Sequence, residues 1–440
     1  MISYDLPGDK QYQERIFPDP RDLDPDVRDR LGTYQDVIAH FTSSSLKEDG
    51  IAVVQDRVIV AQRDGDAGYR ISFDPVPEYA AQARQFADMH VRMLDQNHAG
   101  LALRGFDACK ETPAWNPMDG YPVKPRGALS QWVPCLPLGM PIVNHRAVIL
   151  LHYPPIVAYQ GADYLKNNTL RRWAQILNCV GIDEPQRYHA ILDVNPIAAP
   201  GSGESEYEND YFPISLTSVF FDNDRNGLTY VRSMLDLTLD PPANRESEFT
   251  LPLLVCGSTV YDPQAPGWFR TRYKEQLPRD HGAPTADVLQ AGYVNINPRS
   301  AKQTPYMIAN HMIAAGVMGA CTDDLTRIPN IQKFEAQDLA AASFLAEFAK
   351  AARRGRPIDP GMAKRNACQR WFGADDGLGA PYPPDEDDRL TICALGQWDL
   401  CFNKDTSLPM YTYEEAKERC RRRGGSDYSP CFGCGALLPP

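Results

Sequence analysis

The stretch Gln303–Thr322, QTPYMIANHMIAAGVMGACT, contains no charged residue and decides how the rest of the chain is interpreted. Thr304 and Pro305 are typical of a helix start, because threonine caps the first turn and the first helical position does not need the N–H that proline lacks. The residues that follow are mostly apolar or small. A helix that is apolar or small on every face is typical of the core of a large folded protein. We therefore predict a buried helix over this stretch.

An uncharged run of about twenty residues is also long enough to span a bilayer. This run contains Pro305, Asn310, His311 and two glycines, and no basic cluster flanks it. We therefore expect a soluble protein with no membrane span. His311 is interpreted as a buried core histidine, with a role as base or ligand as the alternative.

Segments on both sides of this stretch have strand or helix patterns. Short runs rich in Val, Ile, Tyr and Phe predict strands at 51–54, 57–61, 69–74, 147–153, 188–194, 249–261 and 291–297. Four main helices are predicted at 78–98, 162–180, 303–322 and 335–353, with shorter ones at 25–41, 267–276 and 413–422. The two kinds of segment are interspersed without strict alternation, so the sequence predicts an α+β fold, with mixed α/β as the alternative.

Changes in composition along the 440 residues divide the chain into four parts. We predict an N-terminal arm at 1–50, a small α+β unit at 51–110, a main α/β core at 111–355 and a tail at 356–440. The tail is rich in Cys, Pro and Gly and has one short helix pattern. It has too little apolar periodicity for a core of its own, so we expect it to pack on the main core or on a neighbour.

The charge balance and the first residues limit the cellular role. The formal net charge is −12, and nucleic-acid binding needs a basic face, so we expect no nucleic-acid partner. The segment MISYDLPGDKQYQERIF has neither the basic nor the apolar region of a secretory signal peptide. We expect a cytoplasmic or particle-associated protein.

The chain has 11 cysteines, and five of them lie in the tail: Cys393, Cys401, Cys420, Cys431 and Cys434. Disulfides are not the default interpretation without a signal peptide. The two-residue spacing of Cys431 and Cys434 suits zinc, which needs four ligands in a structural site. The tail has no histidine, so such a site would use two of Cys393, Cys401 and Cys420. Disulfides and free thiols are the alternatives.

The sequence Asp222-Asn-Asp224-Arg-Asn226-Gly227 resembles the first half of a calcium-binding loop of the EF-hand type. Asp222, Asp224 and Asn226 would be its oxygen ligands. The twelfth position is Ser233, where a glutamate is wanted, and the flanking segments have strand patterns. The alternative is a hairpin turn rich in Asp and Asn, residues that favour tight turns.

Two functions from different classes fit these observations. The first is a non-enzymatic structural or interaction subunit of a larger protein assembly. Its partners would be other protein subunits, and we expect a homo-oligomer. The second is a hydrolase that uses acidic residues, with or without Ca or Zn; its candidate carboxylates include those of the acidic segment 204–210. The sequence has no P-loop, GxGxxG, HExxH or GxSxG motif, so we favour the first and leave the catalytic residues unassigned.

Overall fold

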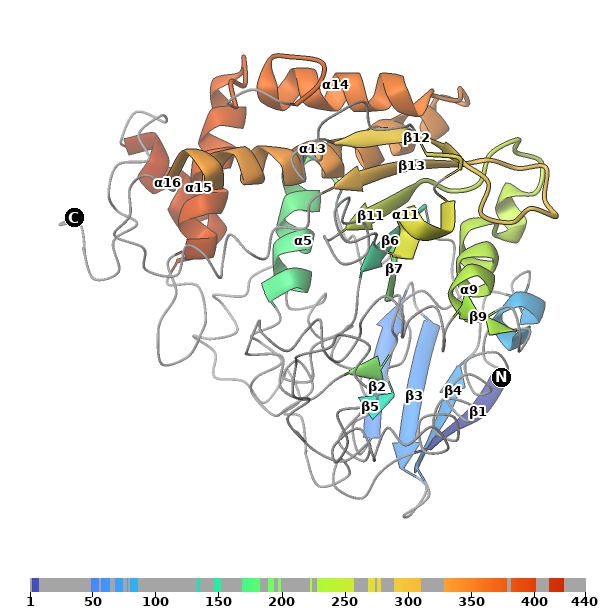
Figure 1. Cartoon of the computed structure of the whole chain (residues 1–440). Coiled ribbons are helices and arrows are strands. Elements are labelled where there is room, and N and C mark those ends of the chain that lie inside the picture. Colours follow the sequence, from blue (N-terminus) through green and yellow to red (C-terminus); the bar gives the residue numbers. More distant parts are fainter. Residues whose placement is uncertain are drawn as a thin grey trace, which may run out of the picture.

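The fold contains a four-stranded sheet and a five-stranded sheet, and helices cover the larger one (Figure 1). The structure is a computed structural model. The residues that it describes are 2–7, 49–54, 57–63, 68–73, 77, 80–85, 133–134, 146–151, 168–182, 189–193, 197–198, 222–223, 228–256, 268–273, 275–277, 289–309, 328–377, 381–400 and 411–422.

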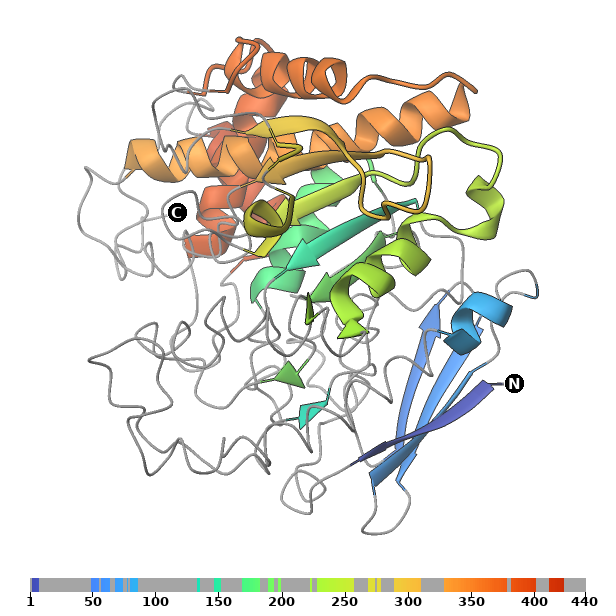
Figure 2. The same cartoon turned by 45° about the vertical axis from the view of Figure 1, so that its right-hand side comes forward.

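The smaller sheet is antiparallel throughout and has the order β1-β4-β3-β2 (Figure 2). Its strands are β1 (Ile2–Pro7), β2 (Asp49–Val54), β3 (Arg57–Arg63) and β4 (Gly68–Phe73). Val54 pairs with Arg57, which confirms the tight turn between the first two predicted strands. Residues 2–7, at the start of the range predicted as an N-terminal arm, form strand β1, which pairs with β4 over its whole length.

The larger sheet is mixed and has the order β12-β13-β11-β6-β7. Its strands are β6 (Ala147–Leu151), β7 (His189–Asp193), β11 (Leu253–Cys256), β12 (Gln290–Val294) and β13 (Thr304–Ala309). Four strands run parallel, and β12 pairs antiparallel with β13 at one edge. Strands covered on both faces are continuously apolar, as β6, β11 and β13 are. The prediction of helices with a sheet of α+β or mixed α/β type is confirmed.

The prediction of a helix over 303–322 is wrong for its first third, because residues 304–309 form strand β13. All six are buried, so the predicted burial is correct and the predicted conformation is not. Tyr306 and Ile308 favour strands, and β11 and β12 flank β13 on both sides. Pro305 lies at the start of the strand, where its missing N–H is tolerated. Residues 310–322 lie outside the described part.

Helices cover both faces of the larger sheet (Figure 2). Ile149, Leu254 and Met307 share one face and pack in one core with α5 (Asn168–Cys179), α13 (Ile328–Arg353) and the tail helices. On the opposite face, β6 contacts α9 (Tyr230–Leu239), and the Tyr306 ring lies 5.7 Å from that of Phe269 in α11 (Trp268–Tyr273). The sheet is therefore the middle of three layers.

Most predicted helices are confirmed within the described residues. Helix α5 lies inside the range predicted at 162–180, α11 inside 267–276, and residues 80–85 are helical inside 78–98. Helix α13 ends where predicted and begins seven residues earlier, at Ile328. The helix predicted at 25–41 lies outside the described part. No helix in the described ranges is both long and apolar enough to cross a membrane.

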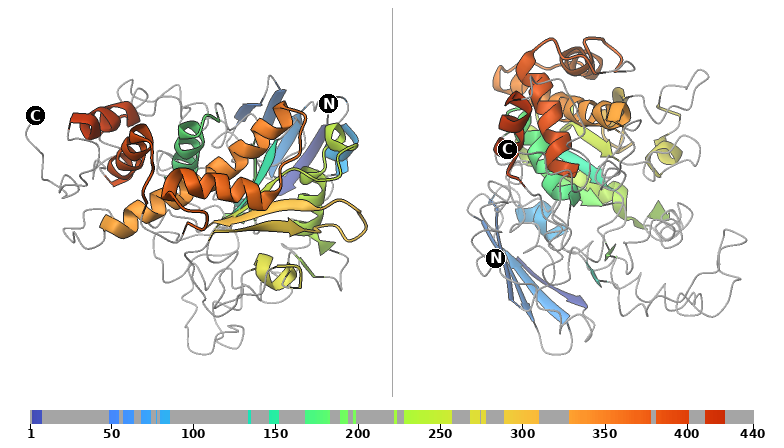
Figure 3. Two further views of the ribbon diagram at one scale, coloured as in Figure 1. Left: turned by 90° about the horizontal axis from the view of Figure 1, so that it is seen from above. Right: turned by 90° about the vertical axis from the view of Figure 1, so that its left-hand side faces the viewer.

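The prediction of only one helix after residue 355 is wrong. Helix α16 (Tyr413–Arg422) is confirmed, but α14 (Pro360–Phe372) and α15 (Glu386–Leu400) precede it. Helix α14 has local start and stop signals: the Asp359 carboxylate accepts a hydrogen bond from the Met362 amide at 3.0 Å, and Gly373, with φ of 65°, ends the helix. Helices α14 and α15 pack against α13, α15 also contacts α5, and α16 packs against α15, so the tail packs on the main core as expected (Figure 3).

A buried disulfide between Cys393 and Cys420 joins α15 to α16, so the expectation against disulfides is wrong at this pair. Two polar contacts fix α14 beside its neighbours. The Arg370 guanidinium binds both carboxylate oxygens of Asp388 in α15, at 2.7 and 2.8 Å. The buried Trp371 indole donates a hydrogen bond to the Ser343 hydroxyl of α13 at 2.8 Å.

The disulfide closes a segment of 27 residues, so its removal should destabilise the tail. Restricting an unfolded segment of this length is worth about 3–4 kcal/mol. We expect the Cys393→Ala/Cys420→Ala variant to lose free energy of unfolding of that order in urea titrations. Wild-type protein reduced before the titration is the matched control and should lose a similar amount. A variant as stable as the oxidised protein would contradict this prediction.

Candidate functional site

One pocket among the described residues lies at the edge of the larger sheet where the parallel strands begin. Its volume is about 630 Å³, in the usual range of ligand pockets. Arg146 immediately precedes β6, Pro252 precedes β11 and Pro305 lies at the start of β13, while the end of α13 and the residues after it form the opposite wall. The lining is largely apolar and includes Phe249, Leu251, Pro252, Tyr293, Pro305, Phe348 and Ile358.

Cationic side chains outnumber acidic ones around this pocket. Arg146, Arg353 and Arg356 line it, against Glu248. Within the described ranges, neither Arg353 nor Arg356 forms an ion pair with an acidic side chain. The chain as a whole has a net charge of −12, so this pocket is locally opposite in sign to the protein.

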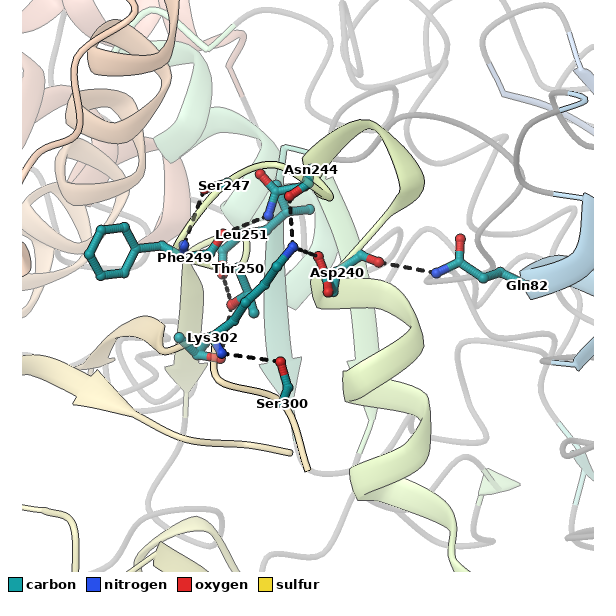
Figure 4. A network of polar contacts seen from close by, with 10 residues as sticks. Gln82, Asp240, Asn244, Ser247, Phe249, Thr250, Leu251, Ser300 and Lys302 are labelled. Atoms are coloured by element: carbon teal, nitrogen blue, oxygen red, sulfur yellow. Dashed lines mark hydrogen bonds and ion pairs between the residues drawn. The ribbon is translucent and has the colours of Figure 1, made fainter. Parts of the chain in front are cut away.

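One lysine holds the wall of the pocket in place (Figure 4). Lys302, in the connection between β12 and β13, donates from Nζ to the Asp240 carboxylate at 2.7 Å and to the Asn244 carbonyl at 2.8 Å. The Asn244 side chain in turn donates to the Phe249 carbonyl at 2.7 Å. Gln82 donates to the Asp240 carbonyl from the opposite side at 3.1 Å. The segment from Asp240 to Phe249 is therefore fixed at both ends by side-chain hydrogen bonds.

Aromatic stacking and a hydroxyl pair complete this wall. The rings of Phe249 and Tyr293 are stacked, with centroids 5.1 Å apart and planes 23° apart. The Thr250 hydroxyl donates to the Thr304 hydroxyl at 2.9 Å, which ties the wall to the first residue of β13. Burial, with a smaller effect from the Asp359 carboxylate, raises the pKa of the Tyr293 phenol. Tyr293 therefore stays neutral near neutral pH and presents an aromatic face.

The free thiols of the described residues are packing groups. Cys256, at the carboxyl end of β11, is buried. Its burial is the larger cause that raises the pKa of the thiol well above its usual value, and the nearby Asp338 carboxylate is the smaller one. Burial likewise raises the pKa of Cys179, and that of Cys368 to about 11. The thiolate is the reactive form of cysteine, so these three side chains are poor nucleophiles near neutral pH.

The structure describes one of the three oxygen ligands predicted for calcium. Asp222 lies in β9 (Asp222–Asn223) and pairs with Thr229 of β10 (Leu228–Thr229), which is the hairpin pairing of the alternative interpretation. Asp224 and Asn226 lie outside the described residues. The strand pattern assigned to the segment after the turn is replaced by a helix from Tyr230, so Ser233 lies in α9. Calcium binding stays a prediction.

The predicted zinc ligands Cys431 and Cys434 also lie outside the described part, as does Cys401. Cys393 and Cys420 are bonded to each other, so while that disulfide persists they cannot supply the two further thiolates that a zinc site needs. Over the described ranges, no three His, Cys, Asp or Glu side chains are grouped so as to hold a metal ion. His311 and the acidic segment 204–210 are outside these ranges too.

Sequence reasoning missed the residues of the pocket, which come from segments far apart in the chain. The signal that could have found part of it is the basic run Arg353-Arg354-Gly355-Arg356 at the end of α13. Comparison of the chain with protein-family models, with curated proteins and with solved structures finds no match.

Replacing Lys302 should loosen the wall of the pocket. In Lys302→Met the partly buried Asp240 carboxylate and the Asn244 carbonyl lose their donor, at a cost of about 1–3 kcal/mol. We expect a loss of that size in the free energy of unfolding and faster amide exchange over 240–250. Arg299→Met, an exposed substitution in the same connection, is the control and should change neither. Equal exchange in both variants would contradict the role of Lys302.

Proposed function

We propose that the chain is a non-enzymatic interaction subunit of a homo-oligomer, and that the pocket beside β11 and α13 receives an acidic segment of a second copy. The observation that carries this proposal is the combination of an aromatic wall and an arginine rim. Aromatic side chains and arginine are enriched at the centres of protein interfaces, where they supply most of the binding energy.

The rigidity of the pocket supports the same function. Lys302, Asn244 and the Phe249–Tyr293 stack fix the wall before any partner binds. A preformed site loses little side-chain freedom on association, so more of the contact energy appears as affinity. The pocket is a concave surface in which a short segment of another chain would be enclosed on several sides.

Charge indicates which segment the pocket would receive. The segment 204–210, ESEYEND, has four carboxylates, no basic residue and one tyrosine. Its carboxylates match Arg353 and Arg356, and its tyrosine matches the apolar lining. Two copies of a protein with net charge −12 repel each other at long range, so a local cationic pocket would direct the approach of an acidic segment.

The mass of the purified protein in solution tests this proposal. Sedimentation equilibrium should give an oligomer for the wild type and a shift of at least about tenfold toward monomer for Arg356→Glu, because a like charge then faces the acidic segment. Arg354→Glu is the matched control, since Arg354 is exposed and lines neither described pocket. Mixing Arg356→Glu protein with Glu206→Arg/Glu208→Arg protein should restore association. A strictly monomeric wild type would overturn the proposal.

A hydrolase that uses acidic residues is the second candidate, and a different edge of the sheet favours it. The chain order of the strands reverses direction between β6 and β11, and open α/β sheets bind ligands outside the carboxyl ends of strands at such a point. The carboxyl end of β11 is Cys256, whose thiol is influenced by Asp338 of α13. Asp338 and Glu335 are both buried on that helix, and buried carboxylates are concentrated at functional sites.

Isosteric variants separate this candidate from the first. If the chain is a hydrolase, wild-type protein should turn over chromogenic esters or phosphomonoesters, and Asp338→Asn should lower the rate by about a hundredfold or more, as expected for a lost acid or base. The exposed Asp359→Asn substitution should leave the rate unchanged. Activity that survives in Asp338→Asn would contradict the assignment of this carboxylate.

A further inference from the structure

A second cavity lies between α13 and α14, on the opposite side of α13's last turns from the larger pocket lined by Phe249 and Tyr293. Its volume is about 200 Å³. Three cationic side chains line it, Lys350, Arg353 and Arg370, together with one carboxylate, Glu347. The remaining lining residues are Val180, Ser343, Ala346, Asn366 and Ala367. This space is too small for a protein segment with bulky side chains and large enough for a compact ion.

The one carboxylate in the lining is already engaged. Glu347 Oε2 accepts a hydrogen bond from the Asn366 side chain at 2.9 Å, and Oε1 accepts one from Lys350 Nζ at 3.4 Å. Its charge is therefore partly neutralised by two donors. Lys350 retains further N–H donors, because an ammonium group has three.

Arg370 is oriented by contacts behind the cavity. Its Nε and Nη2 donate to the two oxygens of Asp388, and its guanidinium lies 4.6 Å from the centre of the Trp371 ring. A guanidinium has five N–H donors, so this pairing leaves others in a fixed direction. The Ser343 hydroxyl, which is 5 % exposed, accepts from Trp371 and keeps its own O–H to donate.

We propose that this cavity binds a tetrahedral oxyanion of the phosphate class, either free inorganic phosphate or the phosphate group of a phosphorylated side chain. Arginine and lysine donors that converge from two helices match the several acceptor oxygens of such an anion. The cationic groups Lys350, Arg353 and Arg370 outnumber the acidic ones even when Asp388, the ion-pair partner of Arg370, is counted with Glu347. The site is separate from the larger pocket except for Arg353, which lines both.

Isothermal titration calorimetry of the full chain with inorganic phosphate, at constant ionic strength, tests the proposal. Wild-type protein should bind with one saturable site, and Lys350→Gln/Arg353→Gln should weaken binding roughly tenfold or more, because two charge-assisted hydrogen bonds are lost. Arg354→Gln is the matched control and should bind like wild type. Far-UV circular dichroism of each variant checks that α13 is retained.

A second variant and a second ligand make the result specific. Asn366→Asp adds a negative charge to the lining without changing the shape of the side chain, and should also weaken phosphate binding. O-phosphoserine, titrated in parallel, separates the two sources of the phosphate group: tighter binding of phosphoserine favours a phosphorylated side chain, and tighter binding of phosphate favours the free ion. No saturable binding of either ligand, or equal affinity in wild type and in the Lys350→Gln/Arg353→Gln variant, would overturn the proposal.

Discussion

The burial of helix α13 is the constraint on which the rest of the described structure depends. From Glu335 to Leu345 every residue of this helix is buried, so it is covered on all sides. It contacts β13 of the sheet, α5, and the tail helices α14 and α15. The small side chains of Ala336 and Ala340–Ala342 allow these neighbours to approach closely, and the indole of Trp371 is satisfied by Ser343 on the same helix. A helix of this kind cannot be exposed without opening the whole core.

Both described cavities follow from where this helix ends. Helix α13 emerges from the core at Ala346; its last two turns carry Lys350 and Arg353 toward solvent, and the exposed Arg354 follows directly after the helix. One side of these turns faces the start of the parallel strands and forms the larger pocket; another faces α14 and forms the smaller cavity. The wall opposite to α13 is held by Lys302, which links segments about sixty residues apart in the chain. A rigid core thus ends in two positively charged concave surfaces.

The sequence predicted the elements whose patterns are local. Strands β6, β7, β11 and β12 and helices α5, α13 and α16 have continuous apolar runs or regular periodicity, and they lie where expected. Thr304 and Pro305 resemble a helix start and an uncharged run of small residues follows them, so the sequence predicts a helix over 304–309, whereas pairing with β11 and β12 fixes these residues as a strand. The sequence does not predict helix α14, although Asp359 is its N-cap, Pro360 its first residue and Gly373 its C-cap, because charged residues interrupt its apolar positions. The Cys393–Cys420 bond depends on the packing of α15 against α16, which the sequence does not show.

The pocket could not be predicted for a related reason. Its residues come from Arg146, the segment 244–252, Tyr293, Pro305 and the end of α13, and only the sheet order brings these together. Of the three residues predicted to bind calcium, the structure describes only Asp222, which pairs with Thr229 as in a hairpin.

Hydrogen–deuterium exchange followed by mass spectrometry measures whether α13 and β13 form the most stable part of one core. Amides that open only on global unfolding exchange slowest. Peptides covering 304–309 and 335–345 should exchange together and more slowly than the exposed turn at 354–357 or the ends of α16. Exchange of 335–345 within the time of the exposed turn, or clearly separate exchange rates for the two peptides under native conditions, would contradict the account.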